Sequence, residues 1–310
     1  MIAYGPVPSR RLGQSIGINN IPPKICTYAC VYCQLGRTLN MQIKRQTFYQ
    51  PDEVVEAVKT KIQKAQESQE PIDYLTFVPD GEPTLDENLG KEIEQLRKTD
   101  RRIAVISNAS LIWREDVRKE LGTAHWVSLK MDTVDEDMWH AVNRPHKGLD
   151  LHSLLDGARE FSKSFNGDLV TETMLIQDMN DKAEIIERTA AFIKTLNPKK
   201  SYISIPIRPP AEEWVKPATE YNINSAYQIF KEQDLDTEYL IGYEGNAFAY
   251  TGNVEEDLLS IVSVHPMRQE AVKIFLEKAQ EDWDTVERLI KDKKLIELNY
   301  QGNKYYMRKL

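Results

Sequence analysis

All three cysteines of this chain lie in one eight-residue stretch, Cys26-Thr27-Tyr28-Ala29-Cys30-Val31-Tyr32-Cys33. The chain has 310 residues, so such clustering indicates one shared role for the three thiols. Three thiols cannot pair as disulfides without leaving one over. Thiolates are the usual ligands of iron–sulfur clusters, and three of them can bind three irons of a four-iron cluster and leave the fourth iron open. The alternatives are a structural zinc site that recruits a histidine, and three unrelated core cysteines.

The composition is that of an ordinary soluble globular protein, with 41% hydrophobic and 28% charged residues. The net charge of −8 argues against a broad electrostatic grip on nucleic acid. No apolar run is long enough to span a bilayer, and the first residues lack the apolar segment of a secretory signal. We therefore expect a cytoplasmic protein without a membrane partner. In that reducing compartment, clustered cysteines more often bind metal than form disulfides.

Short β-rich runs alternate with longer amphipathic runs from about residue 13 to about residue 243. This alternation predicts βα units around a parallel sheet. Strands are expected at 13–18, 74–78, 103–106, 126–132, 169–176 and 202–207. Helices are expected from residue 51 and at 87–97, 150–164, 181–195 and 221–233. Six such units fall short of the eight that close a barrel, so we expect an α/β fold with a partial (β/α)6 TIM-like barrel over residues 1–243.

Residues 254–310 are expected to form a second, small domain. Helices predicted at 267–280 and 283–293 precede two β-rich runs around Gly302, a pattern that predicts a winged-helix-like module. Such modules often bind nucleic acid, but residues 255–310 carry eleven acidic and ten basic side chains. The tyrosines that follow the second helix either stack on bases or pack inside the module, and the balanced charge favours packing. They are Tyr300, Tyr305 and Tyr306.

The cysteine spacing, with Tyr32 directly before Cys33 and a predicted strand before the loop, resembles the signature of the radical S-adenosylmethionine superfamily. The resemblance implies that Cys26, Cys30 and Cys33 hold one 4Fe-4S cluster and that Tyr32 lies among the cofactor contacts. It also implies that the open iron chelates the amino and carboxylate groups of S-adenosylmethionine. Reductive cleavage of the S–C5′ bond would then give a 5′-deoxyadenosyl radical that abstracts a substrate hydrogen.

The turn Asp80-Gly81-Glu82-Pro83 follows the second predicted strand and is similar to the Gly-Gly-Glu-Pro turn of these enzymes. In this chain Asp80 replaces the first glycine, so the likeness covers only the Gly-Glu-Pro part. By that likeness Gly81 lets the backbone approach the methionyl group, and Glu82 accepts its ammonium. An ordinary strand exit is the alternative interpretation of the turn.

Polar residues also end the third and fourth predicted strands. Ser107 and Asn108 lie where similar enzymes contact the ribose or the methionyl carboxylate. Lys130 and Asp132 are two residues apart and so share a strand face. Both are candidate catalytic residues. Lys130 is expected either to meet the methionyl carboxylate or, with a lowered pKa, to form an imine with a carbonyl substrate. A Lys130–Asp132 salt bridge on a solvated rim is the alternative. Ile205 is expected to pack against adenine or, alternatively, in the core.

Two further motifs narrow the resemblance to a prokaryotic group similar to the wyosine-type tRNA-modification synthetases. They are Tyr4-Gly-Pro-Val-Pro-Ser-Arg-Arg-Leu-Gly13 and Arg208-Pro-Pro-Ala-Glu212. The stretch Gln34-Leu-Gly-Arg-Thr38, directly after the cysteines, supports the same resemblance. Wyosine synthetases carry extra cysteines for a second cluster, whereas this chain has none outside the loop. A second cysteine-ligated cluster is therefore excluded, which argues against the wyosine reaction itself.

These observations favour a radical S-adenosylmethionine enzyme whose substrate is a macromolecule, either RNA such as tRNA or a protein. The resemblance implies a reducing partner such as flavodoxin or ferredoxin. Two alternatives stay open: an activase that installs a glycyl radical on a partner enzyme, and an iron–sulfur regulator that binds DNA through the winged helix.

Overall fold

One eight-stranded sheet forms the centre of the protein in the computed structural model, which describes residues 1–309. The strand order is β1-β2-β5-β6-β7-β8-β9-β10. The pair β1–β2 is antiparallel, and every other neighbouring pair is parallel. The strands are β1 (Ala3–Ser9), β2 (Gly13–Ile18), β5 (Tyr74–Phe77), β6 (Arg102–Ser107), β7 (Trp126–Lys130), β8 (Asp168–Met174), β9 (Lys200–Ser204) and β10 (Thr237–Leu240).

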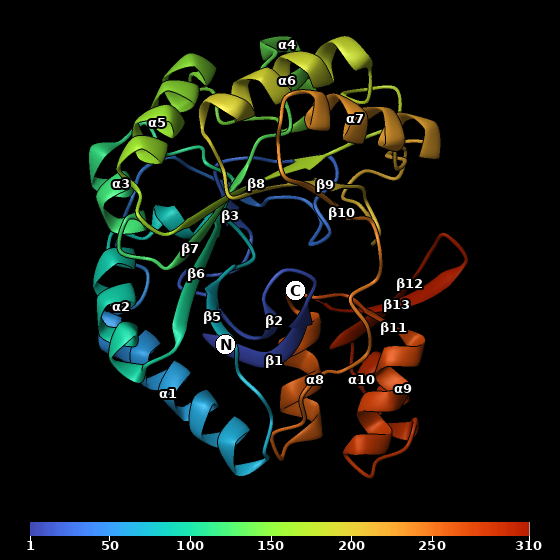
Figure 1. Cartoon of the computed structure of the whole chain (residues 1–310). Helices are drawn as coiled ribbons and strands as arrows, with labels where there is room; N and C mark the ends of the chain where they lie inside the picture. The colour runs from blue at the N-terminus through green and yellow to red at the C-terminus, as the bar shows by residue number, and fades with distance from the viewer. Residues whose placement is uncertain (310) are drawn as a thin grey trace.

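Seven α-helices lie around the outside of this sheet (Figure 1). They are α1 (Pro51–Glu67), α2 (Leu89–Leu96), α3 (Glu115–Leu121), α4 (Glu136–Val142), α5 (Leu151–Ser164), α6 (Ala183–Thr195) and α7 (Glu220–Glu232). Two short 3₁₀ helices, η1 (Pro83–Leu85) and η2 (Arg97–Thr99), precede and follow α2. Helix α1 begins as its sequence indicates, with Pro51 at its first position and the Glu53 carboxylate accepting the Gln50 N–H at 2.8 Å. The predicted α/β fold with a parallel sheet is confirmed.

All six predicted strands are present, but β1 and β10 were not expected from the sequence. Gly5, Pro6 and Pro8 interrupt any strand pattern in β1, and the structure accommodates them because β1 is an edge strand, where proline is tolerated. Strand β10 is only four residues long and forms the opposite edge. The central strands direct apolar side chains such as Leu75, Val105 and Leu129 toward one face, whereas Thr76, Lys130 and Glu172 of the same sheet line the cavity.

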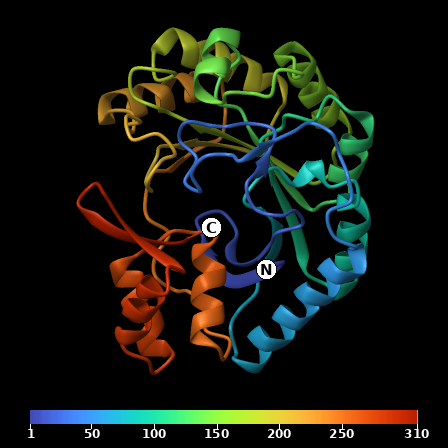
Figure 2. The ribbon, with the colours of Figure 1, turned by 180° about the vertical axis from the view of Figure 1, so that it is seen from behind.

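The C-terminal residues form three helices and a three-stranded sheet. They are α8 (Val254–Val262), α9 (Gln269–Lys278) and α10 (Asp284–Lys291), with β11 (Met267–Arg268), β12 (Leu295–Tyr300) and β13 (Asn303–Arg308) in the order β11-β13-β12. Helix α8 was not expected from the sequence. Tyr4 and Val7 of β1 pack into the hydrophobic core of this part, and α8 lies beside β1 in both views (Figure 1, Figure 2).

Specific polar contacts attach the C-terminal part to the central sheet and its helices. Lys61 of α1 forms a buried ion pair with Asp257 of α8 at 2.6 Å. The Tyr300 hydroxyl donates to the Pro206 carbonyl at 3.1 Å, and the Tyr305 hydroxyl donates to the Ile207 carbonyl at 2.8 Å. Tyr305 and its neighbour Tyr306 are fully buried. Tyr305 and Tyr306 therefore pack inside the protein, whereas Tyr300 is half-buried. Among the helices of residues 1–309, none combines the length and the apolar character that a membrane crossing requires.

Candidate functional site

The cysteine loop lines a cavity of about 350 Å³ that the carboxyl ends of the central strands also line. Two short parallel strands, β3 (Ile25–Cys26) and β4 (Asn40–Met41), join the two ends of the loop. The structure brings together nearly all the residues that the sequence singled out. Those that line the cavity are Cys26, Cys30, Tyr32, Cys33, Gly81, Glu82, Ser107, Asn108, Lys130 and Ile205. Asp132 lies outside this lining.

The three cysteines are free, half-buried thiols with polar groups aimed at two of them. The Nδ2 amides of Asn108 and Asn143 lie 3.5 Å from the sulfurs of Cys26 and Cys30, respectively. Burial raises the pKa of all three thiols, that of Cys30 to about 12, and a bound cation would stabilise their thiolates.

The three-dimensional arrangement of possible metal ligands can be compared with what a zinc ion and a four-iron cluster each require. Within residues 1–309, no three His, Cys, Asp or Glu side chains converge as one metal ion requires. A four-iron cluster bonds each thiolate to a different iron, so it needs no such convergence. Three thiols from one loop are a donor set that fits a four-iron cluster with one open iron.

Gly81 lets the turn after β5 touch the start of the cysteine loop. It adopts φ +153°, and a Cβ at this position would lie 1.9 Å from the Ile25 carbonyl oxygen. The neighbouring Glu82 N–H donates to that same carbonyl at 3.3 Å. The glycine is thus required for close backbone approach, and the backbone it meets belongs to the cysteine loop.

Glu82 is buried, and the ends of two strands hold its carboxylate. Its Oε1 accepts from the Ser107 hydroxyl at 2.8 Å and from the N–H and hydroxyl of Thr84 at 3.1 and 2.6 Å. Its Oε2 accepts only from the Asn108 N–H, at 2.8 Å, which leaves that oxygen with a free lone pair. Burial raises the pKa of Glu82, whereas these hydrogen bonds lower it. A cationic ligand in the cavity would relieve the cost of burying this carboxylate.

Lys130 and Asp132 do not form the exposed salt bridge considered for them. Lys130 is half-buried, and its Nζ lies 3.1 Å from Glu172, 3.6 Å from Asp132 and over the ring of Tyr32. Burial lowers the pKa of Lys130, but these two carboxylates raise it above its usual value overall. The imine chemistry considered for Lys130 requires a lowered pKa, so this arrangement does not favour it.

Asp132 connects neighbouring parts of the site without lining the cavity. Its carboxylate accepts hydrogen bonds from the Tyr32 hydroxyl, from Asn143 Nδ2 at 2.7 Å and from the Met174 N–H at 2.9 Å. The same carboxylate thereby ties the cysteine loop to β8. Asp132 is a positioning residue in this geometry rather than a group that faces the cavity.

Sequence reasoning missed a clamp between Lys24 and Asp80 at the base of the cysteine loop. Lys24 Nζ pairs with Asp80 at 3.1 Å and also donates to the Leu35 carbonyl on the far side of the loop. The Lys24 backbone N–H donates to the Asp80 carbonyl at 2.8 Å. Asp80, which replaces the expected glycine, therefore has a structural role. The sequence showed this replacement but not its contact with Lys24.

Glu172 of β8 was also missed. It faces the cavity between Lys130 and Arg11, and its Oε1 accepts from the Ser204 hydroxyl at 2.9 Å. Burial raises the pKa of Glu172, but the surrounding cations lower it below its usual range, so it is ionised. Its place in the middle of a predicted strand was the available signal, because a charged residue in a buried strand needs partners.

The family can now be assigned by comparison with known proteins. A model of the radical SAM superfamily matches residues 20–192. The chain is 49% identical to the UPF0026 protein MJ1312 of Methanocaldococcus jannaschii over all of its own length and 96% of that protein. The chain belongs to the radical SAM superfamily. It is thus an enzyme of the class that uses a 4Fe-4S cluster and S-adenosylmethionine, and the resemblance found in the sequence is confirmed.

Solved structures of radical SAM enzymes share the fold at low sequence identity. A radical SAM methyltransferase from Sphaerobacter thermophilus aligns with a TM-score of 0.56 at 15% identity, over 73% of this chain and 66% of that one. A structure of TYW1 with a lysine-pyruvate adduct bound aligns with a TM-score of 0.52 at 18% identity, over 71% and 72% of the two chains. These likenesses support the fold and leave the reaction to be argued from the site.

Proposed function

We propose that this radical SAM enzyme uses a single 4Fe-4S cluster, held by Cys26, Cys30 and Cys33, to cleave S-adenosylmethionine reductively and act on a macromolecule. The observation that carries the proposal is that these thiols, the Gly81-Glu82 turn and the end of β6 line one cavity. When bound, the cluster would supply the electron for cleavage and the cofactor the 5′-deoxyadenosyl radical.

The protein groups in the cavity divide the work of binding S-adenosylmethionine. Glu82 is placed to accept the ammonium through the free lone pair of Oε2. Ser107 and Asn108 orient Glu82 and so act as positioning residues. Lys130, protonated because its pKa is raised, is suited to the methionyl carboxylate, and the half-buried Ile205 offers an apolar surface for adenine. Tyr32 holds the Lys130 ammonium against its ring face.

The proposed substrate is a macromolecule, with tRNA as one candidate. The sheet supports this because its edge strands β1 and β10 do not pair with each other within residues 1–309. We therefore infer a partial barrel with a side through which a large substrate reaches the cavity. We also propose that residues 1–243 and 254–310 are two domains and that the second is winged-helix-like. The likeness to TYW1 is one reason to test RNA, and the peptide-bound SuiB of Streptococcus suis, with a TM-score of 0.53, is a reason to test peptides as well.

Two earlier alternatives have less support. No described contact favours a glycyl-radical partner, and a DNA-binding regulator would leave the Glu82 arrangement without a role. For the radical SAM reaction we propose flavodoxin or ferredoxin as the electron donor.

The proposal is tested with protein whose cluster is reconstituted anaerobically and then reduced with dithionite. We expect 5′-deoxyadenosine and methionine from S-adenosylmethionine. Glu82→Gln should keep its iron and weaken S-adenosylmethionine binding about ten- to hundredfold, because one charge-assisted hydrogen bond is lost. Glu87→Gln, an exposed position near the same turn, is the matched control and should bind normally. Absence of cleavage by wild-type protein with a full cluster would refute the enzymatic proposal.

A further inference from the structure

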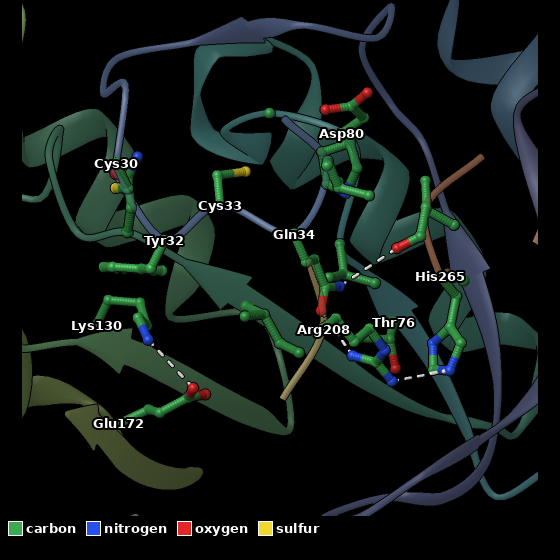
Figure 3. Close-up of a pocket in the computed structure, with 18 of the residues that line it drawn as sticks. Cys30, Tyr32, Cys33, Gln34, Thr76, Asp80, Lys130, Glu172, Arg208 and His265 are labelled. Carbon is green, nitrogen blue, oxygen red and sulfur yellow. Dashed lines mark hydrogen bonds and ion pairs between the residues drawn. The ribbon is translucent and has the colours of Figure 1, made fainter. Parts of the chain in front are cut away.

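A second polar cluster lines the cavity away from the cysteines, and the proposed function uses none of it. Five separate segments supply its members. They are Arg10 from the β1–β2 turn, Gln34 after the last cysteine, Arg208 after β9, Glu244 after β10 and His265 before β11. Figure 3 shows Arg208 and His265 on one side of the cavity, Cys30, Tyr32 and Lys130 on the other, and Gln34 between them.

Arg208 is the centre of this cluster. Its Nη1 donates to Gln34 Oε1 at 2.6 Å, and its Nη2 lies 3.0 Å from His265 Nε2 and pairs with the Glu244 carboxylate. The Nε2 amide of Gln34 donates in turn to the Val264 carbonyl at 3.4 Å. Gln34 thus connects the cysteine loop to Arg208, and the C-terminal part supplies one wall of the cavity.

More cationic than anionic side chains line the cavity. Its cationic side chains are Arg10, Arg11, Lys24, Arg37, Lys130 and Arg208, and its anionic ones are Asp80, Glu82, Glu172 and Glu244. Burial and the two nearby arginines lower the pKa of His265 well below its usual value, so the imidazole is neutral and adds no charge.

Arg10 and Arg208 have fewer carboxylate partners than the other cations do. Lys24 pairs with Asp80, Arg37 with Glu212, Arg11 with Glu172, and Lys130 with both Glu172 and Asp132. Arg10 and Arg208 share the single carboxylate of Glu244, with Arg10 Nε 4.0 Å from Oε2. Burial and the charge of Arg10 lower the pKa of Arg208 to about 9.

The contacts of Glu244 leave room for replacement by a ligand. Its Oε1 contacts Arg208 and lies 2.5 Å from His265 Nε2, but neither buried carboxylate oxygen has a partner in hydrogen-bond geometry, and the Nε of Arg208 is likewise buried and unpartnered. Glu244 stands in the stretch between β10 and α8, which contains neither helix nor strand. Its carboxylate can therefore leave the arginines without breaking a helix or a strand.

We propose that Arg10 and Arg208 bind an oxyanion of the substrate, a carboxylate or a phosphate, in the position that the Glu244 carboxylate occupies in the structure. Guanidinium groups suit both anions because they donate in a planar fork. Gln34 and His265 are positioning residues for Arg208. The inference rests on the proposed function in that it assigns the substrate to the same cavity as S-adenosylmethionine.

The test measures the binding of two probes, inorganic phosphate and acetate, to the cluster-loaded protein saturated with S-adenosylmethionine, by titration calorimetry. The apparent Kd depends on the fraction of molecules in which Glu244 has left, so Glu244→Gln should lower the Kd of the preferred anion about tenfold or more. The better probe distinguishes a carboxylate from a phosphate. The double variant Arg208→Gln/Glu244→Gln, which leaves no buried carboxylate unpaired, should lose binding. Arg37→Gln, an exposed arginine on the same cavity, is the control and should bind like wild type.

Three results would overturn the inference. They are no tighter binding of either probe by Glu244→Gln, an equal loss of binding in Arg37→Gln and in the double variant, and competition between the anion and S-adenosylmethionine. The last would mean that the arginines bind the cofactor's own carboxylate. The same samples are assayed for 5′-deoxyadenosine: loss of cleavage with intact anion binding refutes the proposed function alone, and cleavage without anion binding refutes this inference alone.

Discussion

Gly81→Ala tests whether close backbone contact at the turn after β5 holds the cysteine loop in place. The new Cβ would lie 1.9 Å from the Ile25 carbonyl oxygen, which is 1.1 Å closer than the 3.0 Å that real Cβ contacts keep. The obstacle is backbone, so the start of the loop, with Cys26, must move. Left-handed strain at φ +153° costs about 1–3 kcal/mol, and the forced shift costs about 1–3 kcal/mol more.

We therefore expect Gly81→Ala to lose about 2–6 kcal/mol of unfolding free energy and to take up less iron than wild type on anaerobic reconstitution. Urea unfolding and iron analysis measure the two effects. Gly252→Ala is a matched control, because Gly252 has φ +104° but no atom within 4 Å of its Cβ position. It should show the backbone strain alone and full iron. Full iron in Gly81→Ala, with no greater loss of stability than in Gly252→Ala, would refute the reasoning.

Three further changes test other contacts. Asp80→Asn removes the charge facing Lys24 and should lower stability by about 1–3 kcal/mol and slow cluster uptake; unchanged iron loading would contradict the role of this clamp. Lys61→Ala leaves Asp257 buried and unpaired and should cost about 3–5 kcal/mol in urea unfolding, whereas Lys61→Met/Asp257→Leu should recover most of the loss. Burial and the charge of Asp86 raise the pKa of Glu92 to about 10 in the folded protein. In the unfolded chain the pKa of a glutamate is about 4.3, so the free energy of unfolding of wild type falls as pH rises between these two values. Glu92→Gln cannot ionise, so its melting temperature should rise relative to wild type from pH 5.5 to 8.5, and parallel curves would contradict this.

The residues in the half of the cavity near the cysteines could be predicted from the sequence. Parallel strands end at one edge of a sheet, so Glu82, Ser107 and Lys130, each at or just beyond a predicted strand end, had to lie near the cysteine loop. Tertiary context decided the role of Asp132: it shares a strand face with Lys130, yet its carboxylate is taken up by neighbouring donors.

The other half of the cavity could not be predicted from local pattern. Gln34, Arg208 and His265 meet across separations of 174 and 57 residues, and periodicity says nothing about such contacts. The motifs that contain Arg10 and Arg208 were visible as resemblances, but only folding shows that they share Glu244.

The packing of Tyr4 and Val7 among the C-terminal helices has a consequence for biosynthesis. A ribosome releases β1 more than 240 residues before the apolar partners of these two side chains, such as Leu258 and Phe275. These two side chains must therefore stay uncovered until residues beyond 250 have been synthesised, and the wall of the cavity that carries His265 is completed only after the strands of the central sheet. A complete pocket around the cysteine loop consequently requires residues more than 200 positions beyond it.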